Sequence, residues 1–438
     1  MTVIIISFTI MFNRRIYLDY ASLTPIDKRV IAEMKEYSSA KYANASSWYK
    51  EGVAAKKALD EARSKVAGFI HAHPDEIVFT SGGTEANNMA IMGTIEALRK
   101  NGAKYEDMHA LQSAVEHSSV RECFAELGRR GVAIEEVKVD GRGAVSIDDL
   151  KNKLRANTAI VSVMAVNNET GVIQPVREIA KAIRDARRAG VPPEKRTSPP
   201  SERFKSSGGK MGSRFHFANL SNGGEVRFSG GTGTEQYPYP FLHCDAAQAT
   251  YQEMNMEKLA VDLLTIDGSK ICGPRGVGAL YARRRINIAP VVFGGGQENK
   301  LRSGTENLPA IMGLAKAVEL LRNGKEAESA RLIKLRDYFV SEVRKMRAGV
   351  KVNGEGAEIS PHIANVSIRG IDNEFFIMQL DANGVACSTK SSCLRDEGES
   401  YALNAMGADS KSSIRFSFGR STTSRQLKRA VSIIRRLL

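Results

Sequence analysis

The sequence has few cysteines, a single tryptophan and no long hydrophobic run. Five cysteines in 438 residues, with no Cys-x-x-Cys pair, argue against a disulfide framework and favour a reducing compartment. His71 and His73 have no cysteine or carboxylate at ligand spacing, so we predict no metal site. The apolar run at residues 3–12 is shorter than the ~20 residues of a membrane span. We therefore predict a cytoplasmic protein with no membrane partner and an N-terminal extension over residues 1–15; a membrane anchor is the alternative for this run.

The charge balance is basic but follows no nucleic-acid-binding pattern. Lys and Arg number 63 and Asp and Glu 49, which gives a net charge of +14. The positive charges are spread along the chain, without a stripe of basic and aromatic residues, so no direct nucleic-acid binding is expected. The densest basic segment, near the C-terminus, carries Leu427, Val431 and Ile434 at helical spacing. This spacing predicts a docked amphipathic helix with a solvated basic face.

Apolar runs alternate with helical patterns through the first two thirds of the chain. The runs at 77–80, 159–166, 241–244, 263–266 and 278–282 are β-branched or continuously apolar, as strands buried on both faces are. Helices are expected from an N-cap at Thr24 with Pro25 at the first position, around residues 59–70, from Glu85, and over 177–189. Alternating strands and helices predict an α/β protein with a mainly parallel sheet flanked by helices.

One stretch departs from this pattern. Between residues 191 and 240, Gly, Pro and Ser make up 21 of 50 residues, without periodicity. A loop of this length inside a compact domain is either disordered or functional. We predict a disordered surface insertion there.

Three separate features together suggest a cofactor. A strand at 77–80 runs into Gly82-Gly83-Thr84 and a helix, which is typical of a phosphate-binding turn. Asp245 closes another apolar run, and Lys270 follows a third. A phosphate cradle, a carboxylate for a pyridinium nitrogen and a lysine that can form a Schiff base are the set that pyridoxal phosphate requires.

These motifs, in this order and spacing, resemble those of the cysteine desulfurases of the NifS/IscS type. These are fold-type I pyridoxal-phosphate enzymes in the class V aminotransferase family. The resemblance runs from Ile16-Tyr17-Leu18-Asp19-Tyr20-Ala21 to Ser413-Ile414-Arg415-Phe416-Ser417-Phe418-Gly419-Arg420, apart from the insertion. It implies a large domain over 16–326 with a sheet of the seven-stranded type. It also implies a smaller α/β C-terminal domain over 327–438, joined by the N-terminal segment near 16–25.

The resemblance also implies roles for individual residues. Lys270 would hold pyridoxal phosphate covalently, Asp245 would keep the pyridine nitrogen protonated, and Gln248 would bind the phenolic oxygen. His117, in Val115-Glu116-His117, would stack on the ring and relay protons. The phosphate would be held by Gly83 and Thr84, with Ser269 beside the lysine and Thr305 reaching across from a second subunit. Asn168 and Arg415 would bind the substrate carboxylate, because a guanidinium pairs with a carboxylate through two bonds.

The same resemblance places the reactive thiol at Cys393, at the end of Ala386-Cys387-Ser388-Thr389-Lys390-Ser391-Ser392-Cys393. The polar and acidic residues 394–400 that follow suit a mobile loop that could bring a thiolate to the substrate. Cys387 is expected on a strand, as a small buried hydrophobe. Three departures from the family are notable: Asp267 and Ser269 replace its usual residues before the lysine, Tyr49 stands where the family has His, and Lys390 stands at a family glycine. Asp267 would repel a phosphate dianion if it faced it.

The expected function is conversion of L-cysteine to L-alanine with a persulfide on Cys393, by a homodimer. The sulfur would go to an iron–sulfur scaffold or a tRNA-thiolation acceptor protein. The first alternative is a selenocysteine lyase or another class V aminotransferase-like enzyme that does not need Cys393. The second is a scaffold or nucleic-acid-binding protein that keeps the fold without the chemistry.

Overall fold

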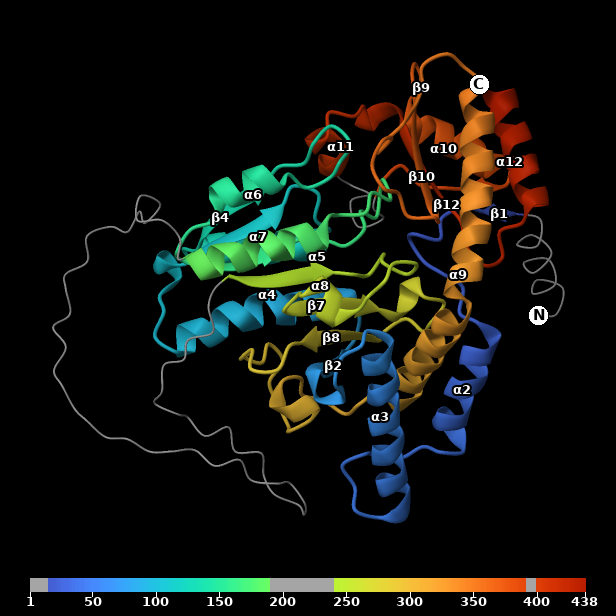
Figure 1. Ribbon diagram of the computed structural model, residues 1–438. Coiled ribbons are helices and arrows are strands. Elements are labelled where there is room, and N and C mark those ends of the chain that lie inside the picture. The colour runs from blue at the N-terminus through green and yellow to red at the C-terminus, as the bar shows by residue number, and fades with distance from the viewer. Residues whose placement is uncertain (1–14, 190–239, 391–398) are drawn as a thin grey trace.

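The computed structural model describes residues 15–189, 240–390 and 399–438. The predicted insertion and Cys393 lie outside the described residues, as does the predicted N-terminal extension apart from its last residue. Two elements flank the insertion directly: helix α7 (Val176–Ala189) before it and strand β6 (Phe241–Asp245) after it. Figure 1 shows the arrangement.

A seven-stranded sheet forms the centre of the molecule. Its strand order is β2-β8-β7-β6-β5-β3-β4. The pairs β3–β4, β3–β5, β5–β6 and β6–β7 are parallel, and only β8 runs antiparallel to both of its neighbours. The remaining strands of this sheet are β2 (Ile77–Thr80), β3 (His109–Ser113), β4 (Ala133–Val137), β5 (Thr158–Ser162), β7 (Leu263–Asp267) and β8 (Gly278–Ala282). The prediction of a mainly parallel α/β sheet is confirmed.

Helices cover both faces of this sheet (Figure 1). Alternate strand residues belong to different hydrophobic clusters: Val161 and Leu264 pack on one side, and Ile160 and Leu263 on the other. Strands buried on both faces read as continuous apolar runs, which is why the sequence pattern located them. The helices that pack here are α2 (Lys28–Ser39), α3 (Lys50–Phe69), α4 (Gly83–Lys100), α5 (Ser118–Arg129), α6 (Ile147–Lys153), α7, α8 (Met256–Leu259) and the first half of α9 (Leu308–Arg344).

A second hydrophobic cluster lies around the C-terminal half of α9. It joins Ile16 and Leu18 from the N-terminal segment to Leu335 and Phe339 of α9. The surrounding elements are β1 (Ile16–Tyr17), β9 (Val350–Val352), β10 (Ile363–Ile368), β11 (Val385–Ala386), β12 (Ser413–Ser417), α10 (Asn373–Ala382) and α12 (Ser424–Leu437). Helix α11 (Tyr401–Ala405) instead packs on Val115 and Met164. Strands β12, β10 and β9 form an antiparallel sheet, and β1 pairs with β11 in parallel. Helix α9 runs through the predicted boundary near residue 327, and the division into two domains stays a prediction.

The first predicted helix starts later than its sequence pattern suggested. Helix α2 begins at Lys28, and its N-cap is Asp27, whose carboxylate accepts a hydrogen bond from the backbone N–H of Arg29 (2.9 Å). The predicted N-cap, Thr24, is used elsewhere. Its hydroxyl donates to the carbonyl of Ser269 (2.7 Å) and accepts from the N–H of Cys272 (2.9 Å). Thr24 therefore ties the N-terminal segment to the turn that carries Lys270.

The expected C-terminal helix is present as α12, with Leu427, Val431 and Ile434 buried. Among the described residues, no helix combines the length and the apolar character needed to cross a membrane.

Candidate active site

A cavity of about 180 Å³ lies at the carboxyl ends of the parallel strands. This edge is where ligands bind in open α/β sheets, because loops from several strands converge there. Asp245 ends β6, Asp267 ends β7, and Gly83 follows β2. The predicted site residues that line the cavity are Gly83, Thr84, His117, Asn168, Asp245, Gln248, Lys270 and Arg415.

Three predicted site residues are not part of this lining. Ser269 lies next to Lys270, and its carbonyl accepts hydrogen bonds from the backbone and side chain of Thr24. Thr305 is exposed, and its expected role requires a second subunit. Cys393 lies outside the described residues. The roles of all three stay predictions.

Lys270 is the last residue of a 3₁₀ turn, Gly268–Lys270, that directly follows β7. The turn is capped by Asp267, whose Oδ1 accepts from the N–H of Ser269 (2.8 Å). The ammonium of Lys270 donates to the carbonyl of Ser22. A strand end, a tight turn and the N-terminal segment together direct the amine into the cavity.

A chain of hydrogen bonds joins Asp245 to His117 in the wall of the cavity. Asn87 donates from Nδ2 to Asp245 Oδ2 (2.8 Å) and to Ser119 Oγ (2.8 Å). Ser119 in turn contacts His117 Nδ1 through its hydroxyl (2.8 Å), and its backbone N–H donates to the same nitrogen (3.2 Å). Since Nδ1 accepts, the neutral imidazole carries its proton on Nε2. Asp245, expected at the pyridine nitrogen of a cofactor, and His117, expected to stack on its ring, are thus oriented by one network.

The N-terminus of α4 forms one end of the cavity. Gly82, just before it, has φ +149°, a conformation that other residues rarely adopt. A Cβ built on Gly83 would lie only 3.2 Å from Asp267 Oδ2. The helix N-terminus suits a phosphate. The carboxylate of Asp267 nevertheless faces this helix N-terminus. A phosphate bound here would therefore meet the carboxylate–phosphate repulsion that the sequence predicts.

At the other end, Arg415 is a buried cation beside Asn168. Its guanidinium is 1% exposed and donates to the carbonyl of Asn168 (2.8 Å) and to Asp19 Oδ1 (2.8 Å). Its Nε has no hydrogen-bond partner among the described residues. A buried charge with an unsatisfied donor is costly unless a ligand pairs with it. This end of the cavity therefore suits a carboxylate.

Both ends of the segment that carries Cys393 are fixed at this site. On one side, the backbone of Ser388 exchanges hydrogen bonds with that of Arg415 (2.7 and 3.2 Å). On the other side, Ser400 donates to Glu169 Oε2 (2.6 Å) and Tyr401 donates from its hydroxyl to the carbonyl of Glu116 (2.5 Å).

Cys387 lies before this segment and is a poor nucleophile. Burial and the nearby Asp19 raise the pKa of its thiol well above the usual range. Because the thiolate is the reactive form, the interpretation of Cys387 as a structural residue is supported.

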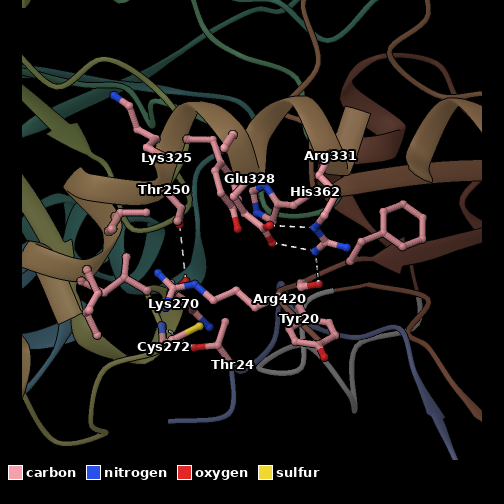
Figure 2. A pocket seen from close by; sticks show the side chains of 18 of the residues that line it. Tyr20, Thr24, Thr250, Lys270, Cys272, Lys325, Glu328, Arg331, His362 and Arg420 are labelled. Carbon is pink, nitrogen blue, oxygen red and sulfur yellow. Dashed lines mark hydrogen bonds and ion pairs between the residues drawn. The ribbon is translucent and has the colours of Figure 1, made fainter. Parts of the chain in front are cut away.

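A second, larger cavity of about 490 Å³ is also lined by Lys270 (Figure 2). Its wall includes Cys272, His362 and Arg420, and the ion pair between Arg331 and Glu328 (2.7 Å) of α9. It shares Lys270 with the smaller cavity but none of the other predicted site residues.

The smaller cavity has the groups that pyridoxal phosphate requires. Lys270 supplies an amine, Asp245 a carboxylate, and His117 an imidazole within one enclosure. The N-terminus of α4 offers backbone N–H groups beside Gly83, where a side chain would crowd the Asp267 carboxylate. The residues fit the group, with Asp267 as the one unfavourable charge.

Several lining residues went unpredicted. Asn87 and Ser119 orient Asp245 and His117, and Asp19, which is outside the lining, pairs with Arg415. Asn87 lies one turn after Gly83 on α4, and this spacing was the only signal in the sequence. Asp19 was part of a recognised motif, but nothing local shows that it meets Arg415.

Comparison with known proteins shows the family of the chain. A family model described as aminotransferase class V matches residues 16–191 and 238–430. The chain belongs to this family.

Within the family, curated cysteine desulfurases resemble the chain along nearly its whole length. A cysteine desulfurase IscS of Dictyoglomus turgidum is 36% identical, with 97% of this chain and 95% of the relative covered. A putative cysteine desulfurase IscS 1 of Bacillus subtilis is 33% identical, with 95% and 96% covered. The chain is thus a member of the cysteine desulfurase group.

Solved structures are similar as well. A NifS-like protein has a TM-score of 0.78 at 28% identity, covering 97% of this chain and 99% of its own. DndA from Streptomyces lividans has a TM-score of 0.67 at 31% identity, covering 92% and 99%. The predicted family and fold are confirmed.

Proposed function

We propose that the chain is a pyridoxal-phosphate-dependent cysteine desulfurase. It converts L-cysteine and the thiol of Cys393 into L-alanine and a persulfide on Cys393, so that one sulfur atom moves from substrate to enzyme. The observation that carries this proposal is the cavity that gathers Lys270, Asp245 and His117 next to the buried Arg415. Full-length similarity to cysteine desulfurases supports it.

Each end of the cavity has a separate task. Asp245, held by Asn87, would keep a proton on the pyridine nitrogen, and Gln248 would donate to the phenolic oxygen. Arg415 and Asn168 bind the carboxylate of L-cysteine and thereby orient its α-carbon toward Lys270. When bound, pyridoxal phosphate supplies an electron sink for the α-carbon.

Lys270 and His117 handle the protons. The Nζ of Lys270 removes the α-proton of the bound amino acid. His117 Nε2 delivers a proton to the bound reactant as it becomes alanine. The Cys393 thiolate attacks the sulfur of the substrate, the carbon–sulfur bond breaks, and its electron pair stays with the carbon that becomes the alanine methyl group.

The short tether between Ser388 and Cys393 supports this role for the Cys393 thiol. It follows Ser388 by five residues, which span at most ~18 Å when fully extended. Ser388 is bonded to Arg415, the residue we assign to the substrate carboxylate. A thiol on this tether can meet the substrate and later present its persulfide to an acceptor.

We further propose a homodimer. Large aromatic side chains are exposed in two places: the segment between α2 and α3, where Trp48 is 97% and Tyr42 72% exposed, and the loop before Thr305, where Phe293 is 77% exposed. Arg63 of α3 pairs with Glu298 (2.6 Å), so α3 and that loop lie side by side. Exposed apolar surface of this kind marks interfaces, and a second subunit here would bring Thr305 to the partner's site.

The proposed location is cytoplasmic, in keeping with the free thiols of Cys123, Cys244, Cys272 and Cys387. The proposed partners are L-cysteine and a sulfur acceptor protein of iron–sulfur cluster assembly, in line with the IscS names of the relatives; a tRNA-thiolation acceptor is the alternative. We propose domains at 16–326 and 327–438.

The test compares Cys393→Ser with Cys387→Ser as a matched control. The protein is loaded with pyridoxal phosphate, and alanine formation from L-cysteine is measured. We expect Cys393→Ser to lose alanine formation and Cys387→Ser to keep it. Unchanged turnover in Cys393→Ser would instead favour a selenocysteine lyase or another family activity that does not need this thiol.

A further inference from the structure

His362 is a buried histidine that sequence analysis left without a role. It directly precedes β10 and is 5% exposed. Its Nε2 lies 3.2 Å from Gln248 Oε1, and its Nδ1 lies 2.8 Å from Ser360 Oγ. Its ring packs against Tyr251, with 5.3 Å between centroids. His362 also lines the larger cavity (Figure 2), so it stands between that cavity and a residue of the catalytic one.

The partners determine which nitrogen of His362 carries the proton. An amide oxygen only accepts hydrogen bonds, so Nε2 must donate to Gln248, and Nδ1 accepts from the hydroxyl of Ser360. Burial and the positive charges of Arg415 and Arg336 lower the pKa of His362 to about 3. The imidazole is therefore neutral, with a single donor directed at Gln248.

This donor fixes the orientation of the Gln248 amide. The Nε2 of Gln248 donates to the carbonyl of Ala21 (2.6 Å), while its Oε1 receives the proton of His362. Reversing the amide would bring two donors together at His362 and two acceptors together at Ala21. Since buried polar groups lose their hydrogen bonds in such an arrangement, only one orientation is favourable.

We propose that His362 is a positioning residue that holds the amide of Gln248 with its nitrogen toward the catalytic cavity. One N–H of this nitrogen goes to Ala21, and the second is directed at the phenolic oxygen of the cofactor. The inference rests on the proposed function and deepens it, because the ring contact of Gln248 then depends on a residue outside the cavity.

Two substitutions of similar polarity separate positioning from packing. His362→Gln can place an amide N–H where Nε2 now lies, whereas His362→Asn reaches only the position of Nδ1. Ser360→Ala removes the hydroxyl that selects the tautomer and leaves His362 itself in place. Gln248→Ala provides the background in which the proposed contact is absent.

The first readout is the pH midpoint of the visible absorption change of bound pyridoxal phosphate, and the second is the affinity of the apoprotein for it. A hydrogen bond to the phenolate oxygen lowers this midpoint. We expect His362→Asn to raise the pH midpoint by about one pH unit, because a hydrogen bond to a charged oxygen is lost. The same variant weakens cofactor binding several-fold. Ser360→Ala shifts the midpoint less in the same direction, and His362→Gln stays near the wild-type value.

The double variant gives the decisive comparison. In the Gln248→Ala background, His362→Asn adds no further shift if it acts through Gln248. If the wild-type protein shows the visible band, two results would overturn the role of His362. One is a pH midpoint that does not move in His362→Asn, and the other is a full additional shift in the double variant. A wild-type protein with no visible band after loading overturns the proposed function itself, and this inference with it.

Discussion

Asp267 is the one charge in the cavity that opposes the cofactor, so its removal should tighten cofactor binding. Its Oδ1 caps the turn of Lys270, while its Oδ2 faces Gly83 at the N-terminus of α4. Asp267→Asn keeps the volume and the capping oxygen and removes only the charge. The turn that positions Lys270 is therefore retained.

The expected gain can be worked out from the charge alone. Two unit charges about 5 Å apart interact by ~3 kcal/mol at an effective dielectric constant near 20. Asp267 is partly exposed, and solvent screening at such a site lowers this value. We expect a gain of about 1.5–3 kcal/mol, which corresponds to roughly ten- to hundred-fold tighter binding of pyridoxal phosphate.

The assay titrates the apoprotein with pyridoxal phosphate and follows the visible absorption. Pyridoxal, which has no phosphate, serves as the ligand control and should bind wild type and Asp267→Asn equally. Asp60→Asn, on the exposed surface of α3, is the control variant. The reasoning is refuted if Asp267→Asn binds pyridoxal phosphate no more tightly than wild type, or if it gains equally for pyridoxal.

Three further outcomes are expected. Lys270→Ala abolishes the visible absorption band of the loaded protein; a band that persists would mean that another amine holds the cofactor. Arg415→Lys keeps the charge opposite Asp19 but loses the planar donor pair, so the KM for L-cysteine rises about ten- to hundred-fold in steady-state assays; an unchanged KM would remove Arg415 from substrate binding. Glu116 is buried, and burial, with the nearby Asp245, raises its pKa to about 7. The folded protein thus holds this proton above the unfolded pKa near 4.5, and stability falls as pH rises between about 5 and 7, by up to ~3 kcal/mol. Glu116→Gln should flatten this slope in denaturant unfolding, and an identical slope would contradict the assignment.

The strands were the most predictable part of the fold. The bounds of β2 and β8 agree with the apolar runs at 77–80 and 278–282, because both faces of these strands are buried and every position is apolar or small. The predicted start of α2 was wrong. The local pattern at Thr24 could not show that its hydroxyl is hydrogen-bonded to Ser269 and Cys272.

The site was predictable only where motifs are local. Asp245 ends a strand, Gly83 and Lys270 each follow one, and the parallel topology brings strand ends together. His362 and Gln248 are 114 residues apart in sequence, and no local pattern indicates their contact. Residues that orient others through such long-range contacts require the structure, because they have no spacing signal of their own.

The most direct measurement is mass spectrometry of the loaded protein after incubation with L-cysteine in the absence of an acceptor. The account predicts one additional sulfur atom on the peptide that contains Cys393, and none on the peptides of Cys272 or Cys387. Alanine formation without added sulfur on Cys393, or added sulfur on another cysteine, would contradict it.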